Sequence, residues 1–530
     1  MEISSPVYGI NFLVKILCSC KCGYLYILKK KGMVKTMKTT KTQKASVLFM
    51  SIVMAFALFI GAGSASAATD DPTLTDISSS VAWQSGVYTM SGDIFTRSNS
   101  ESSICTVASF PKQTVFLKVK DGYSFEFDEV SESGSAYKKD RKYYYLFDVP
   151  FNKWISMGYF NVYPDRKYLV SVKDNSGKTL TVDMAQSVIE MYSVDNVNHI
   201  PEYYQNYIKN KANVINNLQS KDNAFSFIYM TDIHIQHNTK HFPGLARYLV
   251  KNCGINDIIG NGDWVTAWLS DADGIQGLWD DYDELDTLFA GLPLIKSTGN
   301  HDWAYGSSNQ FNVSEAEIYE HFYKPNIQAG LADGSVVKAD ADATYFYKDD
   351  VKNKMRYIDL TVMDYPSTEE NLANGKNKAW YYYISDEQAE WVKTTALKMP
   401  DDEWTCVVFA HVPILNREEM HRPSDLVVNR EKIRGIIKDF VGKTGDFKNY
   451  KGSFIAWLSG HTHEDFMVYT ADDFTSVVSN GDCQIRTDGT PERTVNTINE
   501  QSFNVFTVDK AKRRVYITRI GAGDDRCFVY

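Results

Sequence analysis

The sequence predicts a layered α/β domain preceded by a small all-β domain, and three observations lead to this fold class. The chain has 530 residues, 44% of them hydrophobic, which is enough for two or three domains with their own cores. Short, aromatic, alternating runs fill residues 81–183, typical of β-strands. After Lys221, apolar runs of strand length alternate instead with helical segments, as in a layered α/β domain.

The chain begins with a predicted signal peptide, residues 1–67. Four lysines, at positions 35, 38, 41 and 44, precede the apolar run Val47–Ile60, and GAGSASA follows with an A-x-A site that ends at Ala67. The apolar run is shorter than the roughly 20 residues that span a bilayer. We therefore expect cleavage after about Ala67 and a secreted or cell-surface protein, with an uncleaved anchor as the alternative. Residues 1–32 are interpreted as an upstream extension, because Met33 or Met37 is a more ordinary start.

Charge argues against nucleic acid as a partner. Residues 1–67 hold nine lysines and one glutamate, so the rest of the chain has 47 basic and 65 acidic side chains and a net charge of −18. Binding to a nucleic-acid backbone depends on a basic surface. A membrane is expected to be contacted only through the signal segment. The five remaining cysteines are scattered and mostly lie in apolar runs, which favours buried thiols over a disulfide framework: Cys105, Cys253, Cys406, Cys483 and Cys527.

Residues 77–190 are expected to form an accessory β-sandwich domain. Five runs predict its strands, and Gly, Asn and Ser turns separate them: TVFLKVK, YSFEFDEV, YYYLFDV, YFNVY and YLVSVK. The segments MAQSVIEMY and IPEYYQNYIKNKANVINNLQ have helical spacing and predict a helical linker, placed at residues 191–223.

The last part, residues 224–530, is the predicted α/β domain. Continuous hydrophobicity marks strands that are buried on both faces. The strands are expected at Phe225–Met230, Ile255–Ile259, Leu292–Ile295, Thr405–Ala410 and Phe454–Leu458. Helices are expected between them, at GLARYLVKN, GLWDDYDELDTLF and NREKIRGIIKDFV.

Each of these five strands ends in residues that bind metal ions. The clusters are Thr231-Asp232-Ile233-His234, Asn261-Gly262-Asp263, Gly299-Asn300-His301-Asp302, His411-Val412-Pro413 and Gly460-His461-Thr462-His463. Sites in open α/β sheets form at the carboxyl ends of the strands. Carboxylate, imidazole and amide oxygen without thiolate suit Mn, Fe or Zn. In an extended chain, residues i and i+2 point to the same side, so each D-x-H or H-x-H pair is expected to face one cleft.

This ordered set resembles the calcineurin-like metallophosphoesterase superfamily, whose pattern is D-x-H, G-D, G-N-H-[DE], a lone H and G-H-x-H. The resemblance covers about residues 224–520. It implies a four-layer αββα sandwich, in which two β-sheets pack face to face between helices. It also implies two divalent metal ions, with Asp263 bridging them. One ion would be bound by Asp232, His234 and His463, and the other by Asn300, His411 and His461.

Two further residues of the G-N-H-D motif are expected to be catalytic. His301 looks like the family histidine that is not a ligand and that donates a proton to the leaving alcohol or stabilises the transition state, with Asp302 orienting its ring. One position departs from the pattern: many members have G-D-x-x-[DN], whereas Thr266 stands at the last position here. Arg519 is expected to hold a phosphate or, more simply, to cap the final strand.

The expected function is that of a secreted, metal-dependent phosphoesterase. It would hydrolyse a phosphomonoester or phosphodiester by attack of a metal-bridging hydroxide at a dinuclear site. The alternative is a surface or carbohydrate-binding protein that uses the N-terminal β-domain, for example on cell-wall polysaccharide, with a weakly active phosphoesterase domain. A metallopeptidase is disfavoured, because no H-E-x-x-H occurs.

Overall fold

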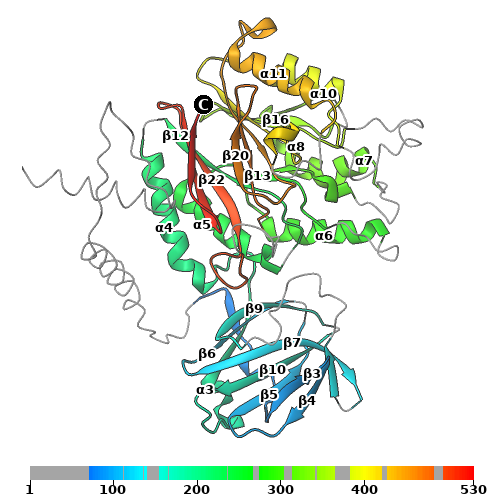
Figure 1. Cartoon of the computed structure of the whole chain (residues 1–530), viewed down its shortest axis with the longest axis vertical. Helices are drawn as coiled ribbons and strands as arrows, with labels where there is room; N and C mark the ends of the chain where they lie inside the picture. Colours follow the sequence, from blue (N-terminus) through cyan, green and yellow to red (C-terminus); the bar gives the residue numbers. More distant parts are fainter. Residues whose placement is uncertain are drawn as a thin grey trace, which may run out of the picture. The chain divides into compact units, whose positions relative to one another are not determined.

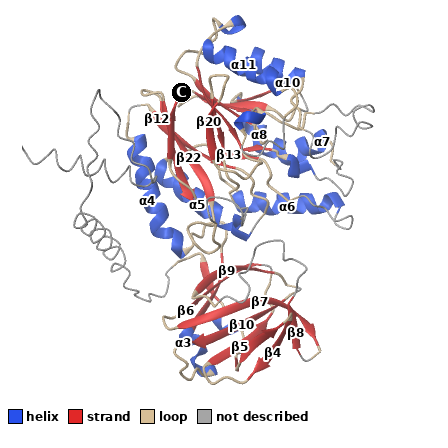
Figure 2. Cartoon of the chain, in the orientation of Figure 1, coloured by secondary structure: helices blue, strands red, loops and turns tan. Residues whose placement is uncertain are grey.

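The described residues form a mixed α/β structure with four sheets (Figures 1 and 2). The computed structural model describes residues 71–111, 113–134, 136–139, 154–164, 166–221, 223–235, 237–266, 274–303, 313–340, 343–364, 382–420, 427–482 and 493–530. The predicted signal peptide and the strand predicted at residues 143–149 lie outside this set. The division of the chain after the predicted signal peptide into two domains and a linker stays a prediction.

Two antiparallel sheets are formed by residues 74–194, in the strand orders β1-β11-β6-β9 and β2-β5-β10-β7-β8-β4-β3. Their strands are β1 Leu74–Asp76, β2 Gln84–Ser85, β3 Val87–Ser91, β4 Ile94–Ser98, β5 Ser103–Ala108, β6 Gln113–Val119, β7 Tyr123–Ser133, β8 Ala136–Lys139, β9 Met157–Val162, β10 Lys167–Asp174 and β11 Ile189–Val194. Side chains of both sheets share one apolar cluster, in which Phe127 of β7 stacks on Phe160 of β9 at 4.2 Å between ring centroids. Four of the predicted strands are found here, as β6, β7, β9 and β10.

One predicted helix is wrong in its second half. The segment MAQSVIEMY begins as a single helical turn, α3 (Ala185–Val188), but continues as β11, which pairs with β6 and β1. Ile189 and Met191 alternate into the core, so the segment also has the period of a strand. Pairing with β6 decides between the two periods. The predicted boundary at residue 190 therefore falls inside a strand.

The remaining strands form two mixed sheets, in the orders β14-β13-β12-β22-β23-β24 and β15-β16-β17-β18-β19-β21-β20. The first contains β12 Ala224–Met230, β13 Ile258–Asn261, β14 Leu294–Ser297, β22 Ser502–Asp509, β23 Arg514–Gly521 and β24 Arg526–Val529. The second contains β15 Val336–Lys338, β16 Phe346–Asp350, β17 Met355–Asp359, β18 Thr405–Phe409, β19 Ser453–Ser459, β20 Phe466–Tyr469 and β21 Thr475–Val478. All five predicted strands are present, as the parallel neighbours β12, β13 and β14 of one sheet and β18 and β19 of the other.

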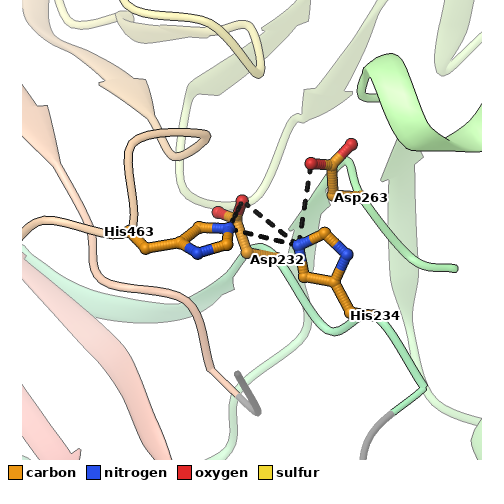
Figure 3. A group of neighbouring side chains, drawn as sticks. All are labelled: Asp232, His234, Asp263 and His463. Carbon is orange, nitrogen blue, oxygen red and sulfur yellow. Dashed lines mark hydrogen bonds and ion pairs between the residues drawn. The ribbon is translucent and has the colours of Figure 1, made fainter. Parts of the chain in front are cut away.

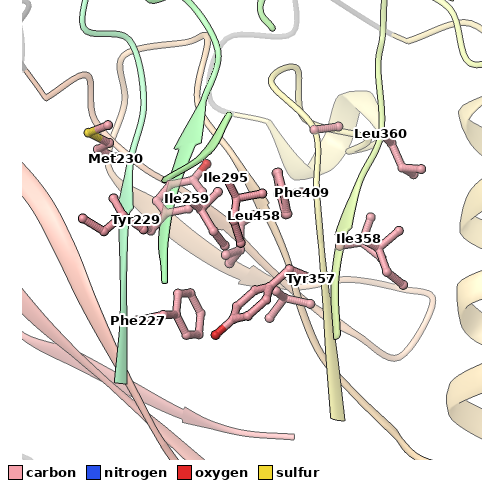
Figure 4. Close-up of a cluster of buried hydrophobic side chains, with 14 of the residues drawn as sticks. Phe227, Tyr229, Met230, Ile259, Ile295, Tyr357, Ile358, Leu360, Phe409 and Leu458 are labelled. Carbon is pink, nitrogen blue, oxygen red and sulfur yellow. The ribbon is translucent and has the colours of Figure 1, made fainter. Parts of the chain in front are cut away.

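Side chains from both mixed sheets fill one hydrophobic core (Figure 4). Phe227 of β12 meets Tyr357 of β17 edge to face, with ring centroids 5.4 Å apart. Ile259 and Leu458 belong to the same cluster and are fully buried. Burying an apolar side chain of this kind contributes about 1.5–3 kcal/mol to the stability of the folded protein. This shared core fixes the two sheets against each other, and with them the loops that follow their strands.

Helices flank the two mixed sheets (Figure 1). The three helices predicted between the strands are found as α5 (Phe242–Cys253), α6 (Gly274–Phe289) and α11 (Arg430–Gly442). The predicted linker helix is α4 (Glu202–Gln219). α4 contacts α5 and the strands β12, β22 and β23, whereas α11 contacts β19. The α-helices after α3 are α4 Glu202–Gln219, α5 Phe242–Cys253, α6 Gly274–Phe289, α7 Glu315–Ile318, α8 Lys324–Asp333, α10 Asp386–Trp391 and α11 Arg430–Gly442. The short 3-10 and π segments are Ser78–Ser80, Val182–Met184, His237–His241, Asn300–Trp303, Tyr319–Tyr323, Val392–Ala396, Arg417–Glu419 and Gly445–Phe447.

Among the described residues, no helix combines the length and apolar character that crossing a membrane requires. The described cysteines are all free thiols. Cys105, Cys253 and Cys406 are buried, as the sequence predicts, whereas Cys527 is exposed. Cys483 lies outside the described residues.

Candidate metal centre

The side chains that the sequence predicts as metal ligands follow the carboxyl ends of five strands and converge from both mixed sheets. Asp232 and His234 follow β12, Asp263 follows β13 and Asn300 follows β14. His411 follows β18, and His461 and His463 follow β19 of the other sheet. Two overlapping groups could each hold a metal ion, and Asp263 belongs to both.

The first group contains Asp232, His234, Asp263 and His463, whose ligand atoms lie within 4.8 Å of one another (Figure 3). Nε2 of His463 lies 2.9 Å from Oδ1 of Asp232 and 3.2 Å from Nε2 of His234. Nε2 of His234 lies 3.7 Å from Oδ2 of Asp263. Two carboxylates and two imidazoles thus face one small volume, a donor set that suits a divalent transition metal.

The second group contains Asp263, His411 and His461, again within 4.8 Å. Nε2 of His411 lies 3.0 Å from the same Oδ2 of Asp263, and the rings of His411 and His461 are 5.3 Å apart. Nδ1 of His411 donates a hydrogen bond of 2.8 Å to the carbonyl oxygen of Asn261. This bond fixes the ring so that Nε2 points at the carboxylates.

Asn300, the predicted amide ligand of the second group, precedes a residue that contacts the shared carboxylate, and its role as a ligand stays a prediction. Its side chain is fully buried, and neither amide atom has a hydrogen-bond partner among the described residues. A buried amide without partners is costly, on the order of 1–3 kcal/mol, unless another group satisfies it. The next residue, His301, donates its backbone N–H to Oδ1 of Asp263 at 2.9 Å, so Asn300 stands beside the carboxylate that both groups share.

The backbone at the ligands differs from the prediction. Asp232, His234, Asp263, His461 and His463 all have positive φ, between 52° and 68°. The sequence predicts that each i, i+2 pair converges because its residues are extended. The positive φ values show that these residues are not extended. They converge because each member lies in a left-handed turn beyond the strand end.

Glycines allow these turns to pack closely. A Cβ atom on Gly460 would lie 2.1 Å from Oγ1 of Thr231 and 2.3 Å from Oδ2 of Asp232. A Cβ atom on Gly299 would lie 2.3 Å from Oδ1 of Asp263. All three distances are far shorter than any real contact of a Cβ atom, so a larger residue would push a ligand carboxylate out of place.

The buried charges of the site shift one another's pKa. Burial raises the pKa of both aspartates, but the neighbouring histidines outweigh it: His463 and His411 lower the pKa of Asp232, and His411 and His301 hold that of Asp263 well below its usual value. Burial lowers the pKa of His234 to about 3. Burial also disfavours charge on His411, but Asp263 and Asp232 raise its pKa to about 10.

The roles predicted for His301 and Asp302 are corrected in part. Nδ1 of His301 donates to the carbonyl oxygen of Thr266 at 2.7 Å, so Thr266 orients the ring. The carboxylate of Asp302 instead accepts from the backbone N–H groups of Trp264, Val265 and Gly299. Asp302 therefore joins the loops that carry Asp263 and Asn300. Burial and the nearby Asp263 raise the pKa of Asp302 to about 7.

Two residues with a role at the site are missing from the sequence prediction. Asn261 is singled out only as part of an N-G-D cluster, yet its carbonyl holds His411. The carbonyl of Thr266 holds His301, which gives a use to the position that departs from the family pattern. Arg519 is fully buried and paired with Asp465 and Ser502, and a role for it in phosphate binding stays a prediction.

Comparison with known proteins gives only distant structural similarity. No family model matches the sequence, and neither does any curated protein. A dimetal phosphatase from Danio rerio is 13% identical with a TM-score of 0.40, over 58% of this chain and 99% of that one. The phosphopantetheinyl hydrolase of Mycobacterium tuberculosis is 14% identical with a TM-score of 0.23, over 48% of this chain and 89% of that one. A 5'-nucleotidase from Candida albicans is 12% identical with a TM-score of 0.25, over 53% of this chain and 46% of that one. The chain is thus similar, over 48–58% of its length, to solved structures that bear these names.

Proposed function

We propose that the protein is an exported, metal-dependent phosphoesterase that hydrolyses a phosphomonoester or phosphodiester. One observation carries the proposal. Side chains that follow four strands of two sheets, β12, β13, β18 and β19, form two groups that could each hold a metal ion and that share the carboxylate of Asp263. A shared carboxylate between two groups of this size is the arrangement that a dinuclear centre requires. Export is proposed from the sequence pattern of residues 1–67 alone.

The donor set supports two divalent ions. In the two groups of described residues, carboxylates and imidazoles meet, with the buried residue Asn300 next to Asp263, a donor set that suits Mn, Fe or Zn. Such ions, when bound, supply a nucleophile at neutral pH and offset charge on the phosphoryl oxygens. We also propose that the two mixed sheets and the helices that flank them form the four-layer αββα sandwich implied by the sequence resemblance.

The protein's own acid would be His301. Its Nδ1 donates to the carbonyl oxygen of Thr266, which fixes the orientation of the ring. Nε2 lies 3.9 Å from Oδ2 of Asp263, beside both metal-binding groups, and the ring is partly exposed. His301 can therefore reach a substrate bound at the site and donate a proton from Nε2 to the leaving alcohol.

Substitution of the shared carboxylate tests the proposal. Asp263→Asn keeps the shape of the side chain but removes its charge, so we expect loss of metal-dependent hydrolysis of bis-p-nitrophenyl phosphate and p-nitrophenyl phosphate. Asp257→Asn is the matched control, because Asp257 is also buried but lies before the other end of β13, where it pairs with Lys348 at 2.7 Å. The control should retain hydrolysis. Equal turnover by Asp263→Asn and the unmodified protein would contradict the proposal.

A further inference from the structure

Asn261, the last residue of β13, connects the two mixed sheets at the metal centre. Its side chain is fully buried. The amide nitrogen Nδ2 donates to the carbonyl oxygen of Ala410 at 3.1 Å and lies 3.4 Å from that of Leu458. Both carbonyls belong to the other sheet, at the ends of β18 and β19. A side chain from one sheet thus holds the ends of the two strands that deliver His411 and His461.

The orientation of this amide follows from its partners. Carbonyl oxygens only accept hydrogen bonds, so the nitrogen of the amide must face Ala410 and Leu458. The same nitrogen lies 2.7 Å from the hydroxyl of Tyr229 in β12. The amide oxygen of Asn261 is buried without a hydrogen-bond partner among the described residues. An unpaired buried oxygen costs about 1–3 kcal/mol, so an apolar residue would suit this place better if Asn261 only filled space.

The backbone carbonyl of Asn261 faces both metal-binding groups. It accepts a hydrogen bond of 2.8 Å from Nδ1 of His411, a residue of the second group. The hydroxyl of Thr231 also lies 2.8 Å from it, and the same hydroxyl lies 2.7 Å from Oδ2 of Asp232 in the first group. This carbonyl oxygen therefore holds a histidine of the second group directly, and the single proton of the Thr231 hydroxyl goes either to this carbonyl or to Asp232.

We propose that Asn261 is a positioning residue of the dinuclear centre, whose side chain fixes its own carbonyl between the sheets so that His411 presents Nε2 to a metal ion. The inference rests on the proposed function. It goes beyond the ligand set, because Asn261 binds no metal itself. Residues that orient a metal-binding histidine through its other ring nitrogen commonly change metal affinity by about 10–100-fold when they are replaced.

Metal binding by the full-length protein tests this role without relying on catalysis. The metal-free protein is titrated with Mn²⁺ in a calorimeter, and its Co²⁺ absorption spectrum is recorded. We expect Asn261→Ala to weaken one of two Mn²⁺ sites by about 10–100-fold and to alter the Co²⁺ spectrum. Gln388→Ala is the matched control. Gln388 is an equally buried amide that donates to the carbonyl of Thr361 and to Asp364, and neither of these is a predicted ligand.

The outcomes separate this inference from the proposed function. Unchanged Mn²⁺ affinity in folded Asn261→Ala, or an equal loss in Gln388→Ala, would overturn the inference. Asn261→Ser keeps a short donor and serves if the alanine variant does not fold; we expect a smaller loss of affinity. If neither variant folds, Asn261 is needed for the fold and not for ligand geometry, which also overturns the inference. If the unmodified protein binds neither Mn²⁺ nor Co²⁺, the proposed function itself fails.

Discussion

At the scale of single residues, the metal centre concentrates backbone strain. Five predicted ligands have positive φ, a conformation that costs a residue other than glycine on the order of 1 kcal/mol or more. Hydrogen bonds between the loops stabilise it. The N–H of Asp232 donates to the carbonyl of Gly262 at 3.0 Å, and the N–H of His234 donates to that of Asp263 at 2.9 Å. The two loops therefore continue the pairing of β12 with β13 beyond the strand ends.

Gly460 offers a test of this close packing. Gly460→Ala would place a methyl group against Thr231 and the carboxylate of Asp232, so we expect lower affinity for Mn²⁺ and lower phosphodiester hydrolysis in a protein that still folds. The control is Gly435→Ala, because Gly435 lies inside α11 with nothing within 4 Å of the new methyl group. The control should raise the free energy of unfolding slightly, by about 0.5–1 kcal/mol. Full metal affinity in Gly460→Ala would contradict this account of the site.

The identity of the ligands follows from sequence more readily than their geometry. Asp232 and His463 stand within five residues of the ends of apolar runs, and that placement predicts which residues meet. Their left-handed conformations are not encoded in a periodic pattern, because single turn residues have none. The actual contacts of Asp302 depend on which backbone N–H groups a neighbouring loop presents. Such contacts are set by tertiary packing and cannot be read from the G-N-H-D motif.

At the scale of elements, the predicted strands are present but unequally placed: β13 is Ile258–Asn261 where the prediction is Ile255–Ile259, and one predicted helix is half a strand. β12, β18 and β19 lie within one residue of the predicted ends, because continuous apolar runs leave little choice. β14 begins two residues late, at Leu294, because Pro293 has no N–H for the ladder. In β11, Ile189 and Met191 fit the period of a helix and that of a strand. The segment is a strand because it pairs with β6, which lies far away in the sequence.

Helix α11 holds the segment after His411 through a buried arginine. Arg434 donates to the carbonyl of Ile414 and to the carboxylates of Glu419 and Asp472. We expect Arg434→Met to lower the free energy of unfolding by about 3 kcal/mol, because both carboxylates would lose a buried partner. Lys438→Met is the control: it removes a more exposed cation from the same helix and the same Asp472, and should cost less than about 1 kcal/mol. Urea unfolding measures both, and equal losses would contradict the role given to Arg434.

The same pair predicts a pH dependence of stability. Burial raises the pKa of Glu419, but hydrogen bonds from Arg434 and from the backbone N–H groups of Asn416 and Ala471 together outweigh it and lower the pKa below the ordinary value. A lowered folded pKa means that the pair stabilises the protein above the unfolded pKa of about 4.3, and that this stability is lost as the pH falls through the folded pKa. Acidification should therefore cost the unmodified protein more stability than it costs Arg434→Met. Parallel losses of stability in the two proteins would contradict this account of Glu419.

At the scale of the whole molecule, the site depends on two sheets that share one core. Asp232 and His463 meet although they come from different sheets and lie far apart in the chain. A strand buried on both faces has the same apolar pattern in either sheet, so the runs alone cannot assign it to one. The division into two sheets entered the prediction only through the family resemblance. Export and binding of surface polysaccharide by the N-terminal sheets stay predictions.

Anomalous X-ray scattering from crystals grown with Mn²⁺ is the sharpest test of the dinuclear centre. We expect two anomalous peaks, about 3.5–4 Å apart, with the carboxylate of Asp263 between them. One peak should lie against Asp232, His234 and His463, and the other against Asn300, His411 and His461. A single peak, two peaks without Asp263 between them, or no peak among these side chains would contradict the proposed dinuclear centre.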